Sequence, residues 1–276
     1  MSVLGFVLFA LALVAATAWW WGPPVWRGLR RSRVLRRPFP PRWRAVLRRH
    51  MPAYARLPPD LQRQLRTLTQ VFVAEKPFVG CGGLVVTDEM RVLVAAQAAL
   101  LQLNRPAGGY PGLRQVLLYP GAFVVDRPQA DASGLVHEGR RALSGESWQE
   151  GQVVLSWDDV LAGAADPADG QNVVIHEFAH QLDAERGRPN GAPVLGALGE
   201  RYERWAAVWN AAFGDVRARL ARGEPSVIGA YGATSPAEFF AVASERFFEC
   251  PQALADEQPA VYRELVGCYA VDPLLW

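Results

Sequence analysis

Two histidines and a glutamate form the most chemically suggestive pattern in this sequence: His176 and His180, with Glu177 between them, in the arrangement His-Glu-x-x-His. Residues four apart lie on the same face of an α-helix, so both imidazoles can bind one metal ion. Neutral imidazole is a common zinc ligand, and three protein ligands leave a fourth position for water. Glu177 lies beside such an ion and can take a proton from the water that the ion activates. The pattern is typical of a zinc metallopeptidase helix.

The surroundings of this pattern favour a metal site over a chance occurrence on an exposed helix. The chain has only four histidines among its 276 residues, so two of them would seldom fall at ligand spacing by accident. Apolar neighbours predict a buried helix, in which the ring nitrogens of a histidine need partners. These neighbours are Val173, Val174, Ile175, Phe178 and Leu182.

A third ligand must come from elsewhere in the chain, and spacing leaves two glutamates as candidates. Ser235, followed by proline, is typical of an N-cap, so a helix is expected to begin there. Glu238 lies three residues later, where its side chain could instead reach back to the Ser235 amide. Glu245 lies two turns further along the same face, and spacing does not choose between the two. Asp183, two turns after the first histidine, could orient a ligand imidazole or be a rival ligand.

Length, charge and cysteine content limit the remaining possibilities. Half of the 276 residues are hydrophobic, which is enough for one sizeable core. The formal net charge is +2, so no direct nucleic-acid binding is expected. Three cysteines without a C-x-x-C pair do not form a disulfide framework and agree with a reducing compartment. They are Cys81, Cys250 and Cys268.

The N-terminal segment predicts a membrane anchor. Residues 1–21 carry no charged side chain, are long enough for a helix that crosses a bilayer, and end in three tryptophans. Arginines crowd the residues that follow, whereas a secretory signal has its positive charge first. The stretch Ala16-Thr17-Ala18 resembles a cleavage site, so a signal peptide is the alternative.

From this layout we expect three parts: a transmembrane helix over residues 1–21, a basic juxtamembrane segment and linker over 22–59, and a catalytic domain over 60–276. The positive-inside rule places the main part of the chain on the cytoplasmic side. The expected location is therefore the inner (cytoplasmic) membrane, as a single-pass protein with its catalytic domain facing the cytoplasm.

The rest of the chain predicts a mainly helical α+β domain with a small sheet. The segment 92–103 is rich in alanine and leucine on almost all sides of the expected helix, which predicts a buried central helix. A strand shortly before the histidine pattern could pair with an extended peptide substrate. The polar segment 126–151 has no clear period and is expected to be a loop. Helices are expected over 61–72, 92–103 and 202–220, and strands over 84–86, 115–119, 122–125 and 153–157.

Five stretches together resemble the family of Mlc titration factor A, a group of gluzincin-type zinc peptidases. The likeness covers roughly residue 38 to the C-terminus, and the joint pattern is far more specific than His-Glu-x-x-His alone. The chain is also similar, more distantly, to the catalytic domain of anthrax lethal factor. The matching stretches are Phe78–Leu84, Tyr119–Phe123, Val154–Asp158, His176–Asp183 and Ser235–Ala241.

This resemblance implies a zincin-like fold and a role for each of several residues. His176 and His180 match the histidine ligands of one Zn²⁺ per chain, and Glu177 matches the general base. Glu238 matches the glutamate ligand, which decides between the two candidate glutamates. Tyr231 matches a tyrosine that could stabilise the oxyanion, a role that suits a phenolic donor near the metal.

Two functions from different classes follow. The first is a zinc-dependent metallopeptidase that hydrolyses peptide bonds in a peptide or protein substrate; the resemblance implies aminopeptidase-like cleavage of short peptides. The second is a regulatory protein that sequesters a transcription repressor, a partner implied by the resemblance, with slow or vestigial peptidase activity. Retention of the base Glu177 favours catalysis. A purely structural zinc site is disfavoured, because such sites are usually closed and cysteine-rich.

Overall fold

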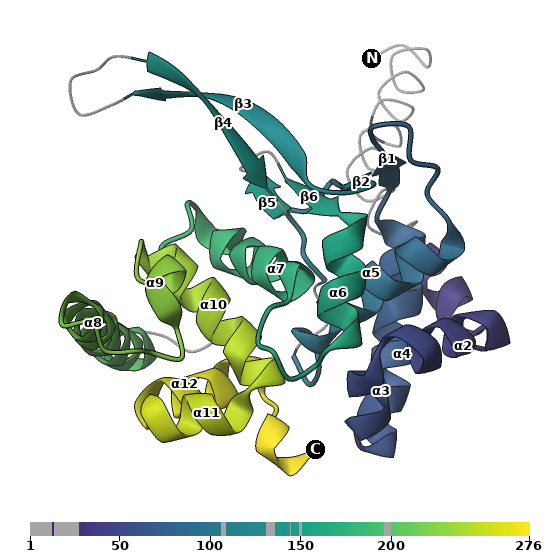
Figure 1. The fold of residues 1–276 in the computed structure, drawn as a ribbon. Helices are drawn as coiled ribbons and strands as arrows, with labels where there is room; N and C mark the ends of the chain where they lie inside the picture. Colours follow the sequence, from purple (N-terminus) through teal and green to yellow (C-terminus); the bar gives the residue numbers. More distant parts are fainter. Residues whose placement is uncertain are drawn as a thin grey trace, which may run out of the picture. The chain divides into compact units, whose positions relative to one another are not determined.

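The computed structural model shows two compact units in the chain, Met1–Phe39 and Pro40–Trp276. In the first unit, residues 28–35 are helical. The second unit holds all of the candidate site residues, and its helices and strands are labelled in Figure 1. The structure describes residues 13, 28–105, 109–130, 136–143, 145–148, 151–195 and 200–276.

The prediction of a transmembrane helix before the catalytic domain was wrong. Among the described residues, no helix is both long and apolar enough to cross a membrane. The longest of these helices, α8 (Glu200–Ala221), has 22 residues but carries arginine and glutamate along its length, whereas a membrane span needs about 20 predominantly apolar residues. Residues 1–21, apart from Leu13, lie outside the described part of the chain. The predicted single-pass inner-membrane location is not supported either.

Four helices begin the second unit: α2 (Pro41–His50), α3 (Pro52–Arg56), α4 (Pro59–Glu75) and α5 (Asp88–Leu100). A proline begins each of the first three, because the first helical position needs no amide hydrogen. In α5, every residue from Val92 to Leu100 is buried, which confirms the predicted central helix. Helices α2 and α4 pack on α5, and α3 packs on α6 (Trp157–Ala165), so the stretch 41–56 belongs to the compact unit.

A small mixed sheet lies beside these helices. Its strands, in spatial order, are β1 (Phe78–Gly80), β2 (Gln115–Tyr119), β6 (Gln152–Ser156) and β5 (Gly145–Trp148). The first three run parallel, and β5 pairs antiparallel with β6. In β2, Val116 and Leu118 alternate into the core, whereas β6 is buried over four consecutive residues, as an interior strand is. Consequently β5, not β6, forms an edge of the sheet.

A long hairpin extends away from the four-stranded sheet (Figure 1). It consists of β3 (Phe123–Ala130) and β4 (Val136–Leu143), which pair antiparallel along their whole lengths. The expectation of a loop over 126–151 was therefore wrong. Among the described strands, β3 and β4 pair with each other and not with the four-stranded sheet.

Two helices that follow β6 carry the chain to the histidine pattern. Ser156, the last residue of β6, caps α6: its Oγ accepts a hydrogen bond from the Asp159 amide at 3.4 Å. After a short loop, α7 (Val173–Asp183) contains both histidines and packs against β5 and β6. The 3₁₀ helix η1 (Ala184–Arg186) continues from its end.

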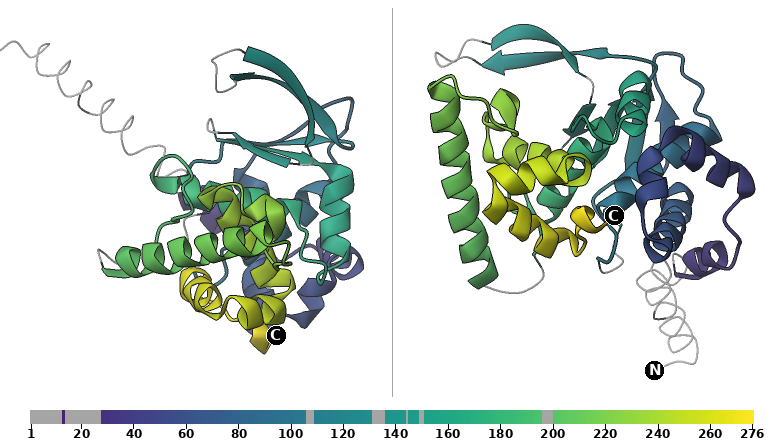
Figure 2. Two further views of the ribbon diagram at one scale, coloured as in Figure 1. Left: turned by 60° about the vertical axis from the view of Figure 1, so that its left-hand side comes forward. Right: turned by 60° about the horizontal axis from the view of Figure 1, so that its bottom comes forward.

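The C-terminal part is a helical layer around α10 (Pro236–Glu249), which packs on α7. Trp205 and Trp209 of α8 stack with ring centroids 4.5 Å apart and contact Phe239 and Phe240 of α10. Figure 2 shows α8 along the outer side of this layer. The remaining elements are α9 (Gly229–Gly232), α11 (Pro251–Glu257), α12 (Pro259–Tyr269) and the 3₁₀ helix η2 (Pro273–Leu275).

Most of the predicted elements are confirmed, with one misplaced strand. The helices over 61–72, 92–103 and 202–220 and the strands over 115–119 and 153–157 match observed elements to within a few residues. The strand expected over 84–86 is wrong, because the residues before the glycine turn pair with β2 instead. Gly82 and Gly83 form that turn with φ of +59° and +81°, which favours glycine.

Candidate metal centre

Helix α7 begins at a glycine turn followed by an asparagine cap. Gly170 has φ +75°, and a Cβ there would overlap the guanidinium of Arg246, so the position requires glycine. The Oδ1 atom of Asn172 accepts a hydrogen bond from the Ile175 amide at 3.0 Å and so satisfies one of the free amides of the first turn. The local sequence therefore fixes where the first histidine of the pattern lies.

Apolar packing holds α7 in the core. Every residue from Val174 to Asp183 is buried, which confirms the predicted buried helix. The ring of Phe178 packs against Phe72 and Tyr110, with centroid separations of 5.6 Å and 4.7 Å. Each such aromatic pair contributes about 0.5–1.5 kcal/mol beyond its burial. This face of α7 anchors the helix, while the histidine face is turned toward α10.

Helix α10 supplies the acidic side chain that faces the two histidines. Its N-cap is Ser235, as predicted, and the Ser235 Oγ accepts a hydrogen bond from the Glu238 amide at 3.2 Å. The Oε2 atom of Glu238 lies 3.0 Å from Nε2 of His176 and 3.4 Å from Nε2 of His180. The carboxylate is thus directed at the histidines rather than at its own cap residue.

Three atoms of these side chains converge at distances that a small tetrahedral ion requires. The two Nε2 atoms lie 3.2 Å apart, close to the 3.0 Å and 3.4 Å that separate them from Glu238. Ligands about 2.0–2.1 Å from a tetrahedral ion lie about 3.3 Å from one another. His176, His180 and Glu238 could therefore hold a metal ion.

The other candidate glutamate lies on the opposite side of the His176 ring. Glu245 Oε1 is 2.8 Å from Nδ1 of His176, and Glu245 Oε2 accepts a hydrogen bond from the Asn172 amide at 2.7 Å. A carboxylate that accepts the Nδ1 proton fixes the tautomer in which Nε2 is free to bind a metal. In this geometry Glu245 orients a histidine and is not grouped with the three converging side chains.

The charges of the cluster are strongly coupled. Burial disfavours the charged imidazolium of His176, but the carboxylates of Glu238 and Glu245 outweigh this and raise the His176 pKa to about 10. Burial likewise disfavours the Glu238 carboxylate, but the two histidines hold its pKa well below the usual range. A bound cation would take over this balancing role and displace the histidine protons, because metal ligands must be deprotonated.

Glu177 is placed to exchange a proton. The residue is only 4% exposed, and its Oε2 has no hydrogen-bond partner among the described residues. Burial raises its pKa to about 7, against the opposing effect of the charges on His176 and His180. A carboxyl group with a pKa near the operating pH can both accept and return a proton efficiently.

Asp183, which the sequence left as an orienting residue or a rival ligand, faces a loop instead. Its carboxylate accepts hydrogen bonds from the amides of Gly191 and Ala192 at 2.7 Å and 2.9 Å. Gly191 has φ +82°, and a Cβ there would meet the carbonyl of Pro236. Asp183 thus fixes the loop after α7 against the start of α10.

Tyr231 lies next to the cluster on the short helix α9. Its ring centroid is 5.7 Å from that of His176, and the two planes are inclined by 32°. The side chain is 55% exposed, which makes it one of the few large exposed side chains with an aromatic ring in the described structure. It can therefore be reached from solvent while it contacts a histidine of the cluster.

These features define a class of protein. A buried His-Glu-x-x-His helix with an acidic third side chain from a second helix is the arrangement of a metallopeptidase-type site. The sequence of residues 26–270 matches the family described as glucose-regulated metallo-peptidase M90, and the chain belongs to this family.

Relatives extend over nearly the whole chain. The chain is 39% identical to an uncharacterized protein of Synechocystis sp. over 264 residues, which cover 95% of this chain and 96% of that protein. It is 38% identical to Mlc titration factor A of Klebsiella pneumoniae over 227 residues, or 81% of this chain and 84% of the relative. The protein of the same name from Yersinia enterocolitica is 34% identical over 235 residues, or 84% and 86%. The resemblance recognised in the sequence is confirmed.

The structure also reveals functional contacts that sequence reasoning missed. Asn172 connects α7 to α10, since its amide donates to Glu245 and its Nδ2 donates to Glu249 Oε1 at 2.9 Å. An asparagine directly before an apolar helical run is a recognisable N-cap signal. No comparable local signal marks Glu249, because its partner lies on another helix.

Proposed function

We propose that the protein is a zinc-dependent peptidase that hydrolyses peptide bonds. The observation that carries this proposal is the convergence of His176, His180 and Glu238 beside the free carboxylate oxygen of Glu177. Two imidazoles and a carboxylate with an open fourth position form the usual donor set of a catalytic Zn²⁺ site. Membership in a metallo-peptidase family supports the same conclusion.

The residues of the chain then have distinct tasks. Zinc, when bound, supplies a Lewis acid that polarises the scissile carbonyl and lowers the pKa of water. Glu177 takes the proton of the attacking water and returns it to the leaving amine. The exposed Tyr231 can donate a hydrogen bond to the oxygen on which negative charge develops. Glu245 keeps His176 oriented throughout.

An extended peptide has a place to pair at the edge of the sheet. We expected this role for the strand before α7, but that strand, β6, is interior, with β2 and β5 on its two sides. The edge nearest β6 is formed by β5, which runs antiparallel to β6 and packs on α7. A substrate that adds to an exposed edge gains main-chain hydrogen bonds that do not depend on its sequence.

The test of this proposal is the substitution Glu177→Gln in the full chain. The amide cannot act as a base, so peptide cleavage should fall by about 10²–10⁴-fold, while the zinc content measured by atomic absorption stays at one ion per chain. Glu257→Gln, at the end of α11, is the matched control. Cleavage that survives Glu177→Gln, or a wild type that binds no zinc after reconstitution, would contradict the proposal.

The substrates for this assay should include free and N-acetylated forms of the same short peptides. The aminopeptidase-like activity implied by the resemblance requires a free amine at the substrate N-terminus. Cleavage of the free peptides alone supports this specificity, and equal cleavage of both forms indicates an endopeptidase.

A second candidate function comes from the names of the relatives. Several of them are called Mlc titration factor A, a name that describes the titration of Mlc. A regulator-binding role for this chain predicts that Mlc binds wild type and Glu177→Gln equally well. A binding role and a catalytic role are then separated by one variant, because only cleavage depends on the base.

A further inference from the structure

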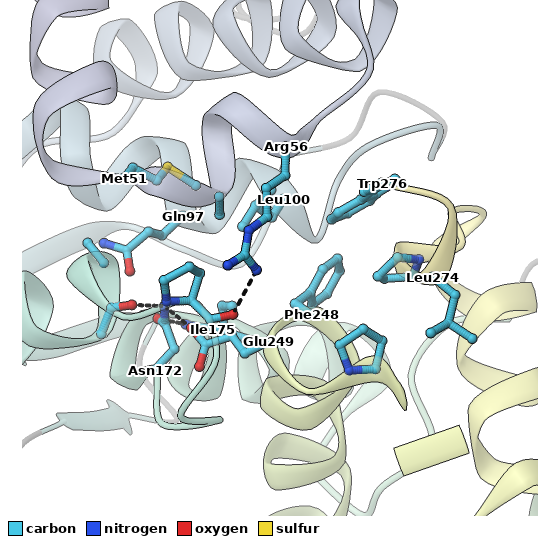
Figure 3. Close-up of a pocket in the computed structure, with 16 residues that line it drawn as sticks. Met51, Arg56, Gln97, Leu100, Asn172, Ile175, Phe248, Glu249, Leu274 and Trp276 are labelled. Carbon is cyan, nitrogen blue, oxygen red and sulfur yellow. Dashed lines mark hydrogen bonds between the residues drawn. The ribbon is translucent and has the colours of Figure 1, made fainter. Parts of the chain in front are cut away.

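A cavity lies beside the N-terminus of α7, where Asn172 and Ile175 form part of its wall. Its volume is about 320 Å³, within the range of small-molecule sites. Helices α3, α5, α6 and α10 contribute to its wall, together with residues near the C-terminus. Figure 3 shows the side chains that surround it. The cavity shares no lining residue with the converging side chains of the metal centre.

The cavity has a polar end and an apolar end. In Figure 3, Gln97 and Asn172 lie toward one end, and Phe248 and Trp276 lie toward the other. The aromatic pair has ring centroids 6.1 Å apart. A ligand that fills such a space needs a polar group at one end and an apolar body at the other.

The polar end presents acceptors that lack partners. Glu249 is 6% exposed and Gln97 is 1% exposed, and both line the cavity. The Oε2 atom of Glu249 and the Oε1 atom of Gln97 are buried, and neither has a hydrogen-bond partner in the described part of the protein. The Gln97 amide nitrogen already donates to the carbonyls of Leu93 and Val160, at 3.3 Å and 3.5 Å. Gln97 Oε1 and the ionised form of Glu249 can therefore each accept a hydrogen bond from a ligand.

Charge favours a cationic donor at this end. Burial, together with the nearby carboxylates of Asp169 and Glu245, raises the pKa of Glu249 to about 8, against the opposing effects of Asn172 and Arg246. An ammonium group would relieve this cost by pairing with the carboxylate. The cavity is also lined by Arg56, an exposed side chain whose Nη1 donates to the carbonyl of Pro167 at 3.5 Å. That guanidinium is directed to the backbone rather than to Glu249.

We propose that this cavity binds a small amine: an ammonium group hydrogen-bonded to Glu249 and Gln97, on an apolar or aromatic body that packs against Phe248 and Trp276. The site is separate from the proposed peptidase chemistry, and its test does not depend on zinc or on cleavage.

Three probes of nearly the same shape test the chemistry of the polar end: 2-phenylethylamine, 2-phenylethanol and phenylacetate. Each is titrated into the full chain by isothermal calorimetry, with ligand-observed NMR as a second readout. The amine should bind at least tenfold more tightly than the alcohol, and the carboxylate should bind most weakly. The proposal is overturned if the amine shows no saturable binding at about 10 mM, which would leave a cavity filled by water, or if phenylacetate binds best.

Variants locate the bound amine. Glu249→Gln keeps the Oε1 acceptor for Asn172 but removes the charge, so it should abolish the tenfold preference for the amine. Ala53→Phe, on the α3 wall, should block all three probes and tests the site through volume instead of charge. Glu257→Gln is the matched control. Because an amine could also bind at the metal centre, Glu238→Ala is included and should not change the affinity. Binding that is lost in Glu238→Ala but kept in Glu249→Gln would overturn the proposal.

Discussion

Two glutamates on one helix show how differently the same side chain behaves at the two ends of the α7–α10 contact. Glu238 and Glu249 are eleven residues apart on α10, which places them on nearly the same helical face. Burial disfavours the charge on both. The pKa of Glu238 is nevertheless held well below its usual range, whereas that of Glu249 is raised to about 8.

The difference arises from partners and not from burial. Glu238 faces two histidines whose positive charge favours its ionised form. Glu249 has the neutral amide of Asn172 as its hydrogen-bond partner and two other carboxylates nearby. A buried carboxylate whose negative charge is balanced by neighbouring histidines suits a metal ligand. A buried carboxylate without such a balancing charge suits a site whose ligand brings the positive charge.

The largest effect expected from this contrast is on metal binding. Glu238→Gln should weaken zinc affinity by more than about 100-fold, since even groups that only orient the ligands cost about 10–100-fold when removed. Glu249→Gln should keep the affinity within a few-fold of wild type. Competition with a zinc-binding dye measures both. Equal losses in the two variants would mean that the two ends of the contact are not functionally distinct.

A smaller effect on zinc affinity is expected for Glu245, which lies between Glu238 and Glu249 on α10. Glu245→Gln should lower zinc affinity by about 10–100-fold, because its carboxylate fixes the orientation and tautomer of His176. Its removal should also leave the Asn172 amide with a weaker acceptor. The same dye competition applies, with Glu257→Gln as the control. An affinity that equals that of Glu238→Gln would point to direct ligation by Glu245 instead.

The third prediction concerns stability. The pKa of Glu249 is about 8 in the folded protein, above its ordinary value of 4.5, so the folded state binds this proton more tightly than the unfolded chain. Wild-type stability must therefore fall between about pH 4.5 and pH 8 through this group. The stability of Glu249→Gln relative to that of wild type should rise by at least about 1–2 kcal/mol between pH 5 and pH 8.5. Urea unfolding at both pH values measures this, and a pH-independent difference would refute the assignment.

The smallest predicted effect is on amine binding. At pH 6, Glu249 is largely protonated, and a bound ammonium must displace that proton. The affinity for 2-phenylethylamine should therefore rise about fivefold between pH 7 and pH 8. Calorimetry in two buffers of different ionisation enthalpy should show proton release at pH 6. A flat profile in wild type, or the same rise in Glu249→Gln, would assign the pH dependence to another group.

The two ends of the contact also differ in how far the sequence predicts them. The spacing of His176 and His180 is a local property of one helix, and so the pattern predicts their common face directly. Glu238 follows from the resemblance to a family, because spacing alone left it equal to Glu245. The Glu249 end could not be predicted, since it depends on how Gln97 and Asn172 from separate segments pack around one carboxylate.

The same distinction, between local sequence patterns and contacts between separate segments, explains which elements of the fold were predicted. Helix α5 was predicted because alanine and leucine on all sides require burial in any context. Of the hairpin β3–β4, only the start was predicted, as a strand over 122–125, because the polar residues that follow show no clear period. The membrane helix was inferred from an uncharged apolar run with tryptophans at its end and arginines after it, and no described helix is long and apolar enough to cross a membrane.

Asn172 joins the cavity wall to the metal centre through three consecutive contacts: Glu249 to its side chain, its amide to Glu245, and Glu245 to His176. In thermodynamic terms, a connection of this kind operates equally in both directions. If an amine in the cavity changes the affinity for zinc by some factor, zinc must change the affinity for the amine by the same factor. A titration of one ligand, repeated with the other present, therefore measures the coupling free energy between the two sites.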